Sequence, residues 1–285
     1  MPEQFIADYE VPVTDLPTQR AIARYLDART ARIDALIARK QRLLELLAER
    51  RAALITRAVT RGLDPAAPTY DSGVDWLGKI PVGWEVKRIK DVSSIRYGLG
   101  EPPAKLIGGV PFIRATDIYR GSVDMSKVQT VDPDEVPWHR RPKLQKGEIL
   151  VVRSGAYTGD SAIISDEVAD SGAVAGYDMV VNVDSAVPEY IAYSLLSKSV
   201  LENQIYLMRS RAAQPHLNAE ELGSVLLVIP NLELQALLVN VLNNKLNQYQ
   251  ALYDKATHSI HHLQEYRSAL ITAAVNGEVE LPQPD

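Results

Sequence analysis

Three loop segments of the sequence concentrate side chains that donate and accept hydrogen bonds. Phe112–Asp117 and Arg153–Asp160 each follow an apolar run, and Arg209–Asn218 links two predicted helices. Arginine can bind guanine through two hydrogen bonds, glutamine or asparagine can bind adenine in the same way, and hydroxyl or cationic side chains hold phosphates. Because of these residue types, we interpret the loops as candidate DNA contacts. The candidate residues are Arg114, Thr116, Arg153, Ser154, Tyr157, Arg209, Arg211, Gln214 and His216.

No catalytic motif accompanies these loops. The sequence lacks the phosphate-binding, dinucleotide-binding, nucleophile-elbow and zinc-protease patterns. His258 and His262 stand four residues apart, a spacing that can bind a metal, but no cysteine or carboxylate partner stands nearby in a strand or loop. Paired acids such as Asp132 and Asp134 are typical of turns and caps. The sequence therefore predicts neither catalytic residues nor a metal site.

Composition sets the class of protein. The chain has 285 residues, 46% hydrophobic and 24% charged, which predicts one or two globular domains. The absence of cysteine excludes disulfides and thiolate metal sites and fits the cytoplasm. No apolar run approaches 18 residues, so we expect no membrane span, and the start of the chain lacks the pattern of a secretion signal. The formal net charge of −5 hides a basic segment, because residues 17–61 hold 11 Lys and Arg against four acids.

The sequence repeats itself after 216 residues. LAERRAALITRAV at 47–59 aligns with LQEYRSALITAAV at 263–275, and the ungapped match gives 14 identities over residues 16–59. The interiors of both copies lack Gly and Pro and are rich in helix formers. Gly62 and Gly277 stand where a helix would stop. The repeat predicts two long helices, at 17–62 and 231–277.

Apolar residues recur every seven residues in both predicted helices, which is typical of a coiled-coil seam. In the first helix we expect the seam, or a subunit interface, at Leu26, Ile33, Leu47 and Leu54, with Leu36 and Leu43 three residues on. In the second helix we expect it at Leu242, Tyr249, Ala256, Leu263 and Leu270, together with Leu252, the repeat counterpart of Leu36. The pattern predicts that the two helices pair within one chain.

Residues 80–230 have a different pattern. Short β-rich runs at 110–113, 148–152, 161–164, 179–183 and 224–229 alternate with helical stretches at 188–208 and 219–222. A polar, proline-containing linker at 63–79 precedes them. The segment predicts a mixed α+β domain that is large enough to fold alone.

Four segments resemble the specificity (S) subunit of type I restriction–modification systems. Tyr70–Val86 carries the pattern D-S-G-x-x-W-L-G-x-I-P-x-x-W, which looks like the start of a target recognition domain in that family. Lys146–Gly155 is similar to the family's central strand and loop, and Gln214–Asn218 to its Q-x-x-L-N segment. Ile229–Gln235, followed by the helix that ends at Tyr266–Thr272, resembles its conserved helical region. The resemblance covers nearly the whole chain.

The resemblance implies a non-catalytic, sequence-specific reader of double-stranded DNA. In that family, two recognition domains each read one half of a split target, and two antiparallel helices hold them apart and dock methyltransferase (M) subunits. The M subunits bind S-adenosylmethionine and methylate adenine, and restriction (R) subunits use ATP. The implied fold is one α+β recognition domain flanked by two long helices that pair as an antiparallel coiled coil. The chain itself would hold no cofactor.

The order of segments departs from the family pattern. We expect a remnant of a preceding domain at 1–16, the first helix at 17–62, a linker at 63–79, the recognition domain at 80–230, the second helix at 231–277 and a tail at 278–285. One recognition domain would read one half-site. The alternatives are a natural half-subunit, a cassette product, a truncation, or pairing with a second S chain.

A second interpretation comes from another class of protein. The two helices would recruit partners as a scaffold, and the basic first helix would face an acidic protein surface instead of phosphates. Salt-dependent retention on DNA distinguishes the two interpretations. A stand-alone enzyme has the least support, because no nucleophile, cofactor loop or metal cluster stands in the sequence.

Overall fold

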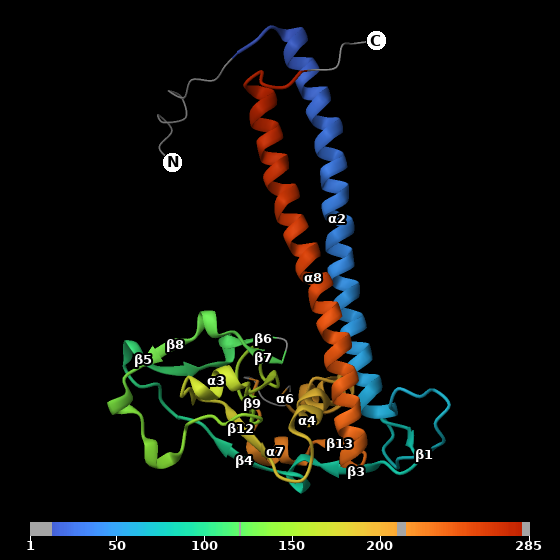
Figure 1. The fold of residues 1–285 in the computed structure, drawn as a ribbon, viewed down its shortest axis with the longest axis vertical. Helices are drawn as coiled ribbons and strands as arrows, with labels where there is room; N and C mark the ends of the chain where they lie inside the picture. Colours follow the sequence, from blue (N-terminus) through green and yellow to red (C-terminus); the bar gives the residue numbers. More distant parts are fainter. Residues whose placement is uncertain (1–12, 120, 210–214, 281–285) are drawn as a thin grey trace. The chain divides into compact units, whose positions relative to one another are not determined.

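The computed structural model describes residues 13–119, 121–209 and 215–280 (Figure 1). The chain forms two compact units, one made of Met1–Glu49 and Asn247–Asp285 and the other of Arg50–Leu246. Helices α2 (Leu16–Arg61) and α8 (Leu232–Val275) precede and follow a domain of short strands and helices in sequence. This order confirms the predicted fold class. Most of the expected remnant at 1–16 lies outside the described residues, and the expected domain limits stay predictions.

Both long helices begin and end where the local sequence favours it. The Asp15 side chain accepts a hydrogen bond from the amide of Thr18 at 2.8 Å, and Asn231 caps the first turn of α8 in the same way. Gly62 and Gly277 follow the two helix ends with φ of 70° and 75°. Glycine adopts this left-handed conformation without a steric penalty, so both predicted stops are confirmed.

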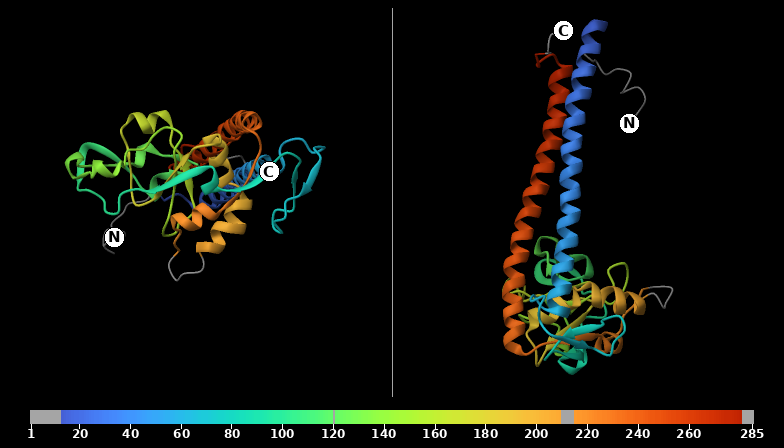
Figure 2. Two further views of the ribbon diagram at one scale, coloured as in Figure 1. Left: turned by 90° about the horizontal axis from the view of Figure 1, so that it is seen from below. Right: turned by 90° about the vertical axis from the view of Figure 1, so that its right-hand side faces the viewer.

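In the first unit the two helices lie side by side and antiparallel (Figures 1 and 2). Asp34 of α2 forms an ion pair with Arg267 of α8, with 2.9 Å between Oδ1 and Nε. The helices of this unit bury five apolar side chains, Ile33, Leu47, Ala256, Leu270 and Ala274. The first four belong to the predicted heptad row, which supports the predicted coiled coil.

The second row of the seam differs from the prediction. Leu36, Leu43 and Leu252 do not lie in the seam, because 45%, 44% and 50% of these residues' surface is exposed. The half-buried second row lies four residues after the first, for example at Ile37 and Leu44. In a heptad the two rows are separated alternately by three and by four residues. The prediction places the second row three residues after the first row, whereas in the structure it lies four residues after it. The other predicted seam residues are buried or half-buried: Leu26, Ile33, Leu47, Leu54, Leu242, Tyr249, Ala256, Leu263 and Leu270.

The domain between the long helices consists of short elements. The strands are β1 (Thr69–Asp71), β2 (Lys79–Pro81), β3 (Glu85–Arg88), β4 (Ser93–Tyr97), β5 (Lys105–Ile113), β6 (Ile118–Tyr119), β7 (Ser122–Val123), β8 (Gln129–Val131), β9 (Ile149–Val151), β10 (Ser161–Ile163), β11 (Val174–Ala175), β12 (Met179–Val183) and β13 (Leu226–Ile229). The helices are α3 (Asp166–Asp170), α4 (Pro188–Leu195), α5 (Lys198–Val200), α6 (Tyr206–Arg209) and α7 (Ala219–Ser224), and a π-helix at Leu201–Ile205 joins α5 to α6. All five predicted β-rich runs contain a strand, whereas the predicted helix at 188–208 is divided into these shorter segments.

The central sheet has the order β10-β9-β12-β4, and all of its pairs are antiparallel. Met179, the first residue of β12, pairs with Tyr97 on one side and with Val151 on the other. Tyr97 ends β4 and Val151 ends β9. The segments that leave β4 and β9 therefore meet the segment that enters β12 at one edge of the sheet.

The main core of the second unit includes the last turns of α2. Tyr190 of α4 is fully buried, and its hydroxyl lies 3.1 Å from the carbonyl oxygen of Val59 and 2.8 Å from that of Val228. Val59 packs in the same core cluster as Tyr190. The C-terminal end of α2 is thus a structural part of the domain. No helix in the described ranges is long and apolar enough to cross a membrane.

Candidate nucleic-acid interface

Two of the three predicted contact loops meet at this sheet edge. Ser154 and His216 form an isolated β-bridge, and the amide of Leu217 donates to the carbonyl oxygen of Arg153 at 2.8 Å. The amide of Gly155 donates to the carbonyl oxygen of Pro215 at 3.2 Å. Backbone pairing therefore brings together segments that are about 60 residues apart in sequence.

The two loops expose different kinds of side chain. Ser154 and His216 are half-buried, whereas Tyr157 is 50% exposed. Arg211 and Gln214 of the predicted site lie outside the described residues, and so does the side chain of Arg209. The described loops thus form a surface that carries hydroxyl and imidazole groups.

Arg153 occupies the centre of this edge. Its guanidinium carbon lies 4.6 Å from the ring centroid of Tyr97 and 4.3 Å from that of Tyr177. Both distances are within the range of a cation–π interaction. Its Nε is buried without a hydrogen-bond partner, and within the described part of the chain the guanidinium makes no ion pair. The two rings therefore hold a half-buried cation whose charge no neighbouring carboxylate neutralises by direct contact.

Two glycines allow the tyrosines to approach each other. Gly98 follows Tyr97, and Gly176 precedes Tyr177. A Cβ atom on Gly98 would lie 2.1 Å from the carbonyl oxygen of Gly176, so a side chain at this position is sterically excluded. The Tyr97 hydroxyl also accepts a hydrogen bond from the amide of Ala219 at 2.9 Å, which fixes the ring.

Asp178 lies behind the Arg153 site. Its carboxylate accepts a hydrogen bond from the amide of Arg153 at 3.2 Å, and the residue is 3% exposed. Burial raises the pKa of Asp178 to about 6, although the Arg153 amide and guanidinium favour the charged form. The carboxylate therefore positions the Arg153 backbone at a cost in desolvation.

Arg114 has a different environment from Arg153. Its Nη2 and Nε lie 2.9 and 3.2 Å from the two carboxylate oxygens of Asp117, which is fully buried. Thr116 is exposed, and its hydroxyl donates to Asp117 at 3.3 Å. This arrangement satisfies a buried carboxylate, and it leaves the Arg114 guanidinium less available to a ligand than that of Arg153.

A cavity of about 260 Å³ connects the two arginine environments. Arg114, Ser154, Tyr177 and Asp178 contribute to its lining, and Phe112 supplies an aromatic ring. The structure thus brings four predicted contact residues, Arg114, Arg153, Ser154 and His216, into one region of the surface. Sequence reasoning missed Tyr97, Tyr177 and Asp178. The Gly176-Tyr177 pair just before the predicted strand at 179–183 and the Tyr97-Gly98 pair are the only sequence signal that we find for the tyrosines.

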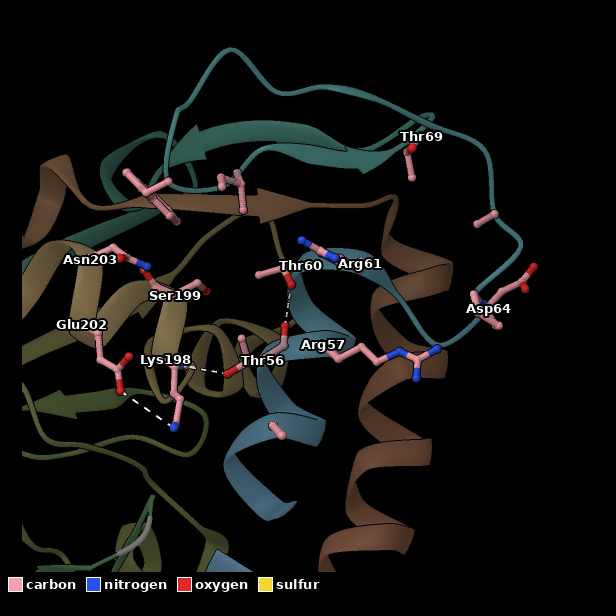
Figure 3. Close-up of a pocket in the computed structure, with 15 residues that line it drawn as sticks. Thr56, Arg57, Thr60, Arg61, Asp64, Thr69, Lys198, Ser199, Glu202 and Asn203 are labelled. Atoms are coloured by element: carbon pink, nitrogen blue, oxygen red, sulfur yellow. Dashed lines mark hydrogen bonds and ion pairs between the residues drawn. The ribbon is translucent and has the colours of Figure 1, made fainter. Parts of the chain in front are cut away.

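A larger cavity, of about 910 Å³, lies beside the C-terminal turns of α2 (Figure 3). Arg57, Arg61 and Lys198 contribute to its lining together with the carboxylates of Asp64 and Glu202. Lys198 Nζ lies 4.0 Å from Glu202. The positive and negative charges that line this cavity largely balance each other, and none of the predicted contact residues lines it.

Two histidines of α8 contact each other. His258 and His262 lie with their Nε2 atoms 2.8 Å apart, and Glu265 accepts from or pairs with His262 at 3.2 Å. The described residues contain no group of three or more His, Cys, Asp or Glu side chains that could hold a metal ion.

Comparisons with known proteins identify relatives of this chain. A family model described as the type I restriction modification DNA specificity domain matches residues 81–253. The chain is 22% identical over 282 residues to the type I restriction enzyme EcoBI specificity subunit of Escherichia coli, covering 96% of this chain and 59% of that subunit. It is 21% identical over 278 residues to the EcoKI specificity subunit of Escherichia coli strain K12, covering 94% of this chain and 57% of that subunit.

A solved structure shares the fold. A chain from a structure of a type I R-M system has a TM-score of 0.70 and 17% identity, covering 94% of this chain and 62% of that chain. The present chain therefore spans less than two thirds of the length of these relatives. The family model covers more than half of the chain, and on that basis the chain belongs to the type I restriction modification DNA specificity domain family.

Proposed function

We propose that this chain is a specificity subunit that reads one half of a split target in double-stranded DNA. The observation that carries the proposal is the Arg153 guanidinium held between Tyr97 and Tyr177. The two rings hold the guanidinium in place, and in this proposal its two Nη groups meet the ligand. A fixed pair of donors matches the O6 and N7 acceptors of guanine in the major groove.

We propose further that the chain is not itself an enzyme and acts through partners. A methyltransferase subunit would bind S-adenosylmethionine, a restriction subunit would bind ATP, and a second S chain could supply the other half-site. The specificity subunits that the chain resembles support this division of roles. The exposed leucines Leu36, Leu43 and Leu46 give α2 an apolar surface on which a partner subunit would dock.

Selection from a pool of randomised DNA duplexes tests the reading function. The purified chain, alone and together with its methyltransferase subunit, is incubated with the pool, and the retained duplexes are sequenced. We expect enrichment of one short motif that contains a G·C pair. Retention without sequence enrichment, or no retention, contradicts the proposal. Co-purification of the methyltransferase subunit without any DNA retention would instead favour the scaffold interpretation.

A further inference from the structure

A basic turn, Trp138–Lys143, lies outside the site described above. His139, Arg140, Arg141 and Lys143 are all exposed. Within the described ranges, their side chains make no ion pair or hydrogen bond. These residues differ in this respect from Arg88, Arg96 and Lys146, each of which is paired with a carboxylate. The turn thus presents cationic groups that the fold itself does not use.

The backbone of this turn is held in place. Trp138 donates from Nε1 to the carbonyl oxygen of Pro133 at 2.9 Å, and the nearby Val136 is 4% exposed. Arg141 has φ 52° and ψ 52°, a left-handed conformation that costs a non-glycine residue about 1 kcal/mol. Among the acids of the preceding turn, Glu135 accepts a hydrogen bond from the backbone amide of Ala104. The surroundings therefore hold the turn in a fixed and strained conformation.

The turn lies next to the strand that leads to the Arg153 site. The amide of Ala175 donates to the carbonyl oxygen of Pro142 at 3.0 Å, and the amide of Leu144 donates to that of Ala173 at 2.9 Å. The two segments run antiparallel, and Lys143 and Val174 form an antiparallel bridge between these two hydrogen bonds. Because Pro142 pairs with Ala175, Arg141 lies at the end of the pairing where the chain continues from Ala175 to Tyr177. Backbone pairing places the basic turn toward the same edge as the stacked arginine.

We infer that the basic turn binds the phosphate backbone of the DNA whose bases Arg153 contacts, an inference that rests on the proposed function. Arg140 and Arg141 supply the principal contacts, and Lys143 supplies a third. Contacts of this kind fix the position of the protein on the duplex and carry no sequence information. They release condensed counterions, so their contribution weakens as salt concentration rises. The turn would therefore provide affinity, and Arg153 selectivity.

The test measures binding of a random-sequence duplex as a function of salt. The variant Arg140→Gln/Arg141→Asn removes both charges, and Asn tolerates the left-handed conformation at position 141. The matched control, Arg88→Gln/Lys146→Gln, removes two charges that are already paired with carboxylates. We expect the slope of log K against log salt to become shallower by about 1.8 in the first variant, at about 0.9 per lost phosphate contact. Between 50 and 200 mM salt the wild type then loses about tenfold more affinity than the variant.

The outcomes separate this inference from the proposed function. It is supported if only the Arg140/Arg141 variant has a shallower slope while its preferred motif stays that of the wild type. It is overturned if the slope is unchanged, or if the control variant changes equally. It is also overturned if the variant loses the methyltransferase subunit instead of DNA, or if the wild type does not bind the duplex. In the last case the proposed function fails as well, whereas an unchanged slope with an intact motif leaves that function standing.

Discussion

Two arginines that look alike in the sequence occupy different environments. Arg153 is stacked between Tyr97 and Tyr177, and Arg114 forms a bidentate ion pair with the buried Asp117. The guanidinium of Arg153 has no carboxylate in contact within the described structure, so a ligand can compete for it. Residue type suggests both positions equally, and the surrounding contacts predict a recognition role for Arg153 and a structural role for Arg114.

Arg153→Ala should reduce sequence selectivity. We expect binding of the selected duplex to weaken by about 1–3 kcal/mol, because one bidentate base contact is lost. Binding of a random duplex at the same salt concentration should change much less. Titration of both duplexes with the wild type and the variant measures the difference. Equal losses on the two duplexes would exclude base recognition by this residue.

Arg114→Ala should instead reduce stability. Removal of the guanidinium leaves the buried Asp117 carboxylate without its main partner, at a cost of about 1–3 kcal/mol. Urea denaturation measures the change. Arg88→Ala is the control, because its ion pair with Asp91 is exposed and should contribute little. An Arg114 variant as stable as this control would show that the buried pair does not support the fold.

Asp178 should make stability depend on pH. Its pKa is raised from 3.8 to about 6 by burial, so the folded state binds the proton more tightly than the unfolded state does. Stability from this group is present below about pH 4 and is lost as the pH rises through about 6. Asp178→Asn should therefore be more stable than the wild type at pH 7.5 by about 2–3 kcal/mol, and equally stable near pH 4. Urea denaturation at both values checks this, and a variant less stable at pH 7.5 would contradict it.

The tyrosines of the site could not be identified from the sequence. Tyr97 and Tyr177 are 80 residues apart, and they meet because β4 and β12 pair and because Gly98 and Gly176 permit close approach. Loop residues rich in donors could be selected by type. Their partners depend on non-local pairing, which residue type alone does not reveal.

At the scale of elements, the helices were the most predictable part of the molecule. A Gly- and Pro-free run, a cap and a terminal glycine set the limits of α2 and α8 to within two residues of the prediction. The prediction of the second row is wrong for a reason that lies in the sequence. The half-buried row includes polar residues such as Thr30 and Arg51, whereas the exposed residues Leu36 and Leu43 look more like a seam because they are apolar. Strands β1 to β4 are short and flank turns. Their apolar and polar residues do not alternate clearly enough for these strands to be predicted from the sequence.

The revised seam predicts different costs for two leucines of the same helix. Leu47 is 6% exposed and Leu43 is 44% exposed. Leu47→Ala should destabilise the helix pair by about 2–3 kcal/mol because it removes buried apolar volume, and Leu43→Ala should change stability by less than about 0.5 kcal/mol. Thermal denaturation followed by circular dichroism measures both. A loss for Leu43 comparable to that for Leu47 would support the second row predicted from the sequence.

At the scale of the whole molecule, net charge is a poor guide to the partner. The sum of −5 coexists with the basic first helix and with the turn at 138–143. The fold places Arg153 at one edge of the domain and leaves the unpaired cations of the basic turn toward the same edge. The local charge there can be positive although the net charge of the chain is negative. The proposed reading of one half-site therefore depends on where the cations stand and not on the net charge.

Methylome sequencing of cells that express this chain with its methyltransferase subunit tests whether the chain selects the DNA target. We expect methylated adenines in one split motif, and Arg153→Ala should relax the motif at a position in one half only. Deletion of the chain should abolish this methylation. Methylation that persists without the chain, or a motif that Arg153→Ala leaves unchanged in both halves, would contradict the account.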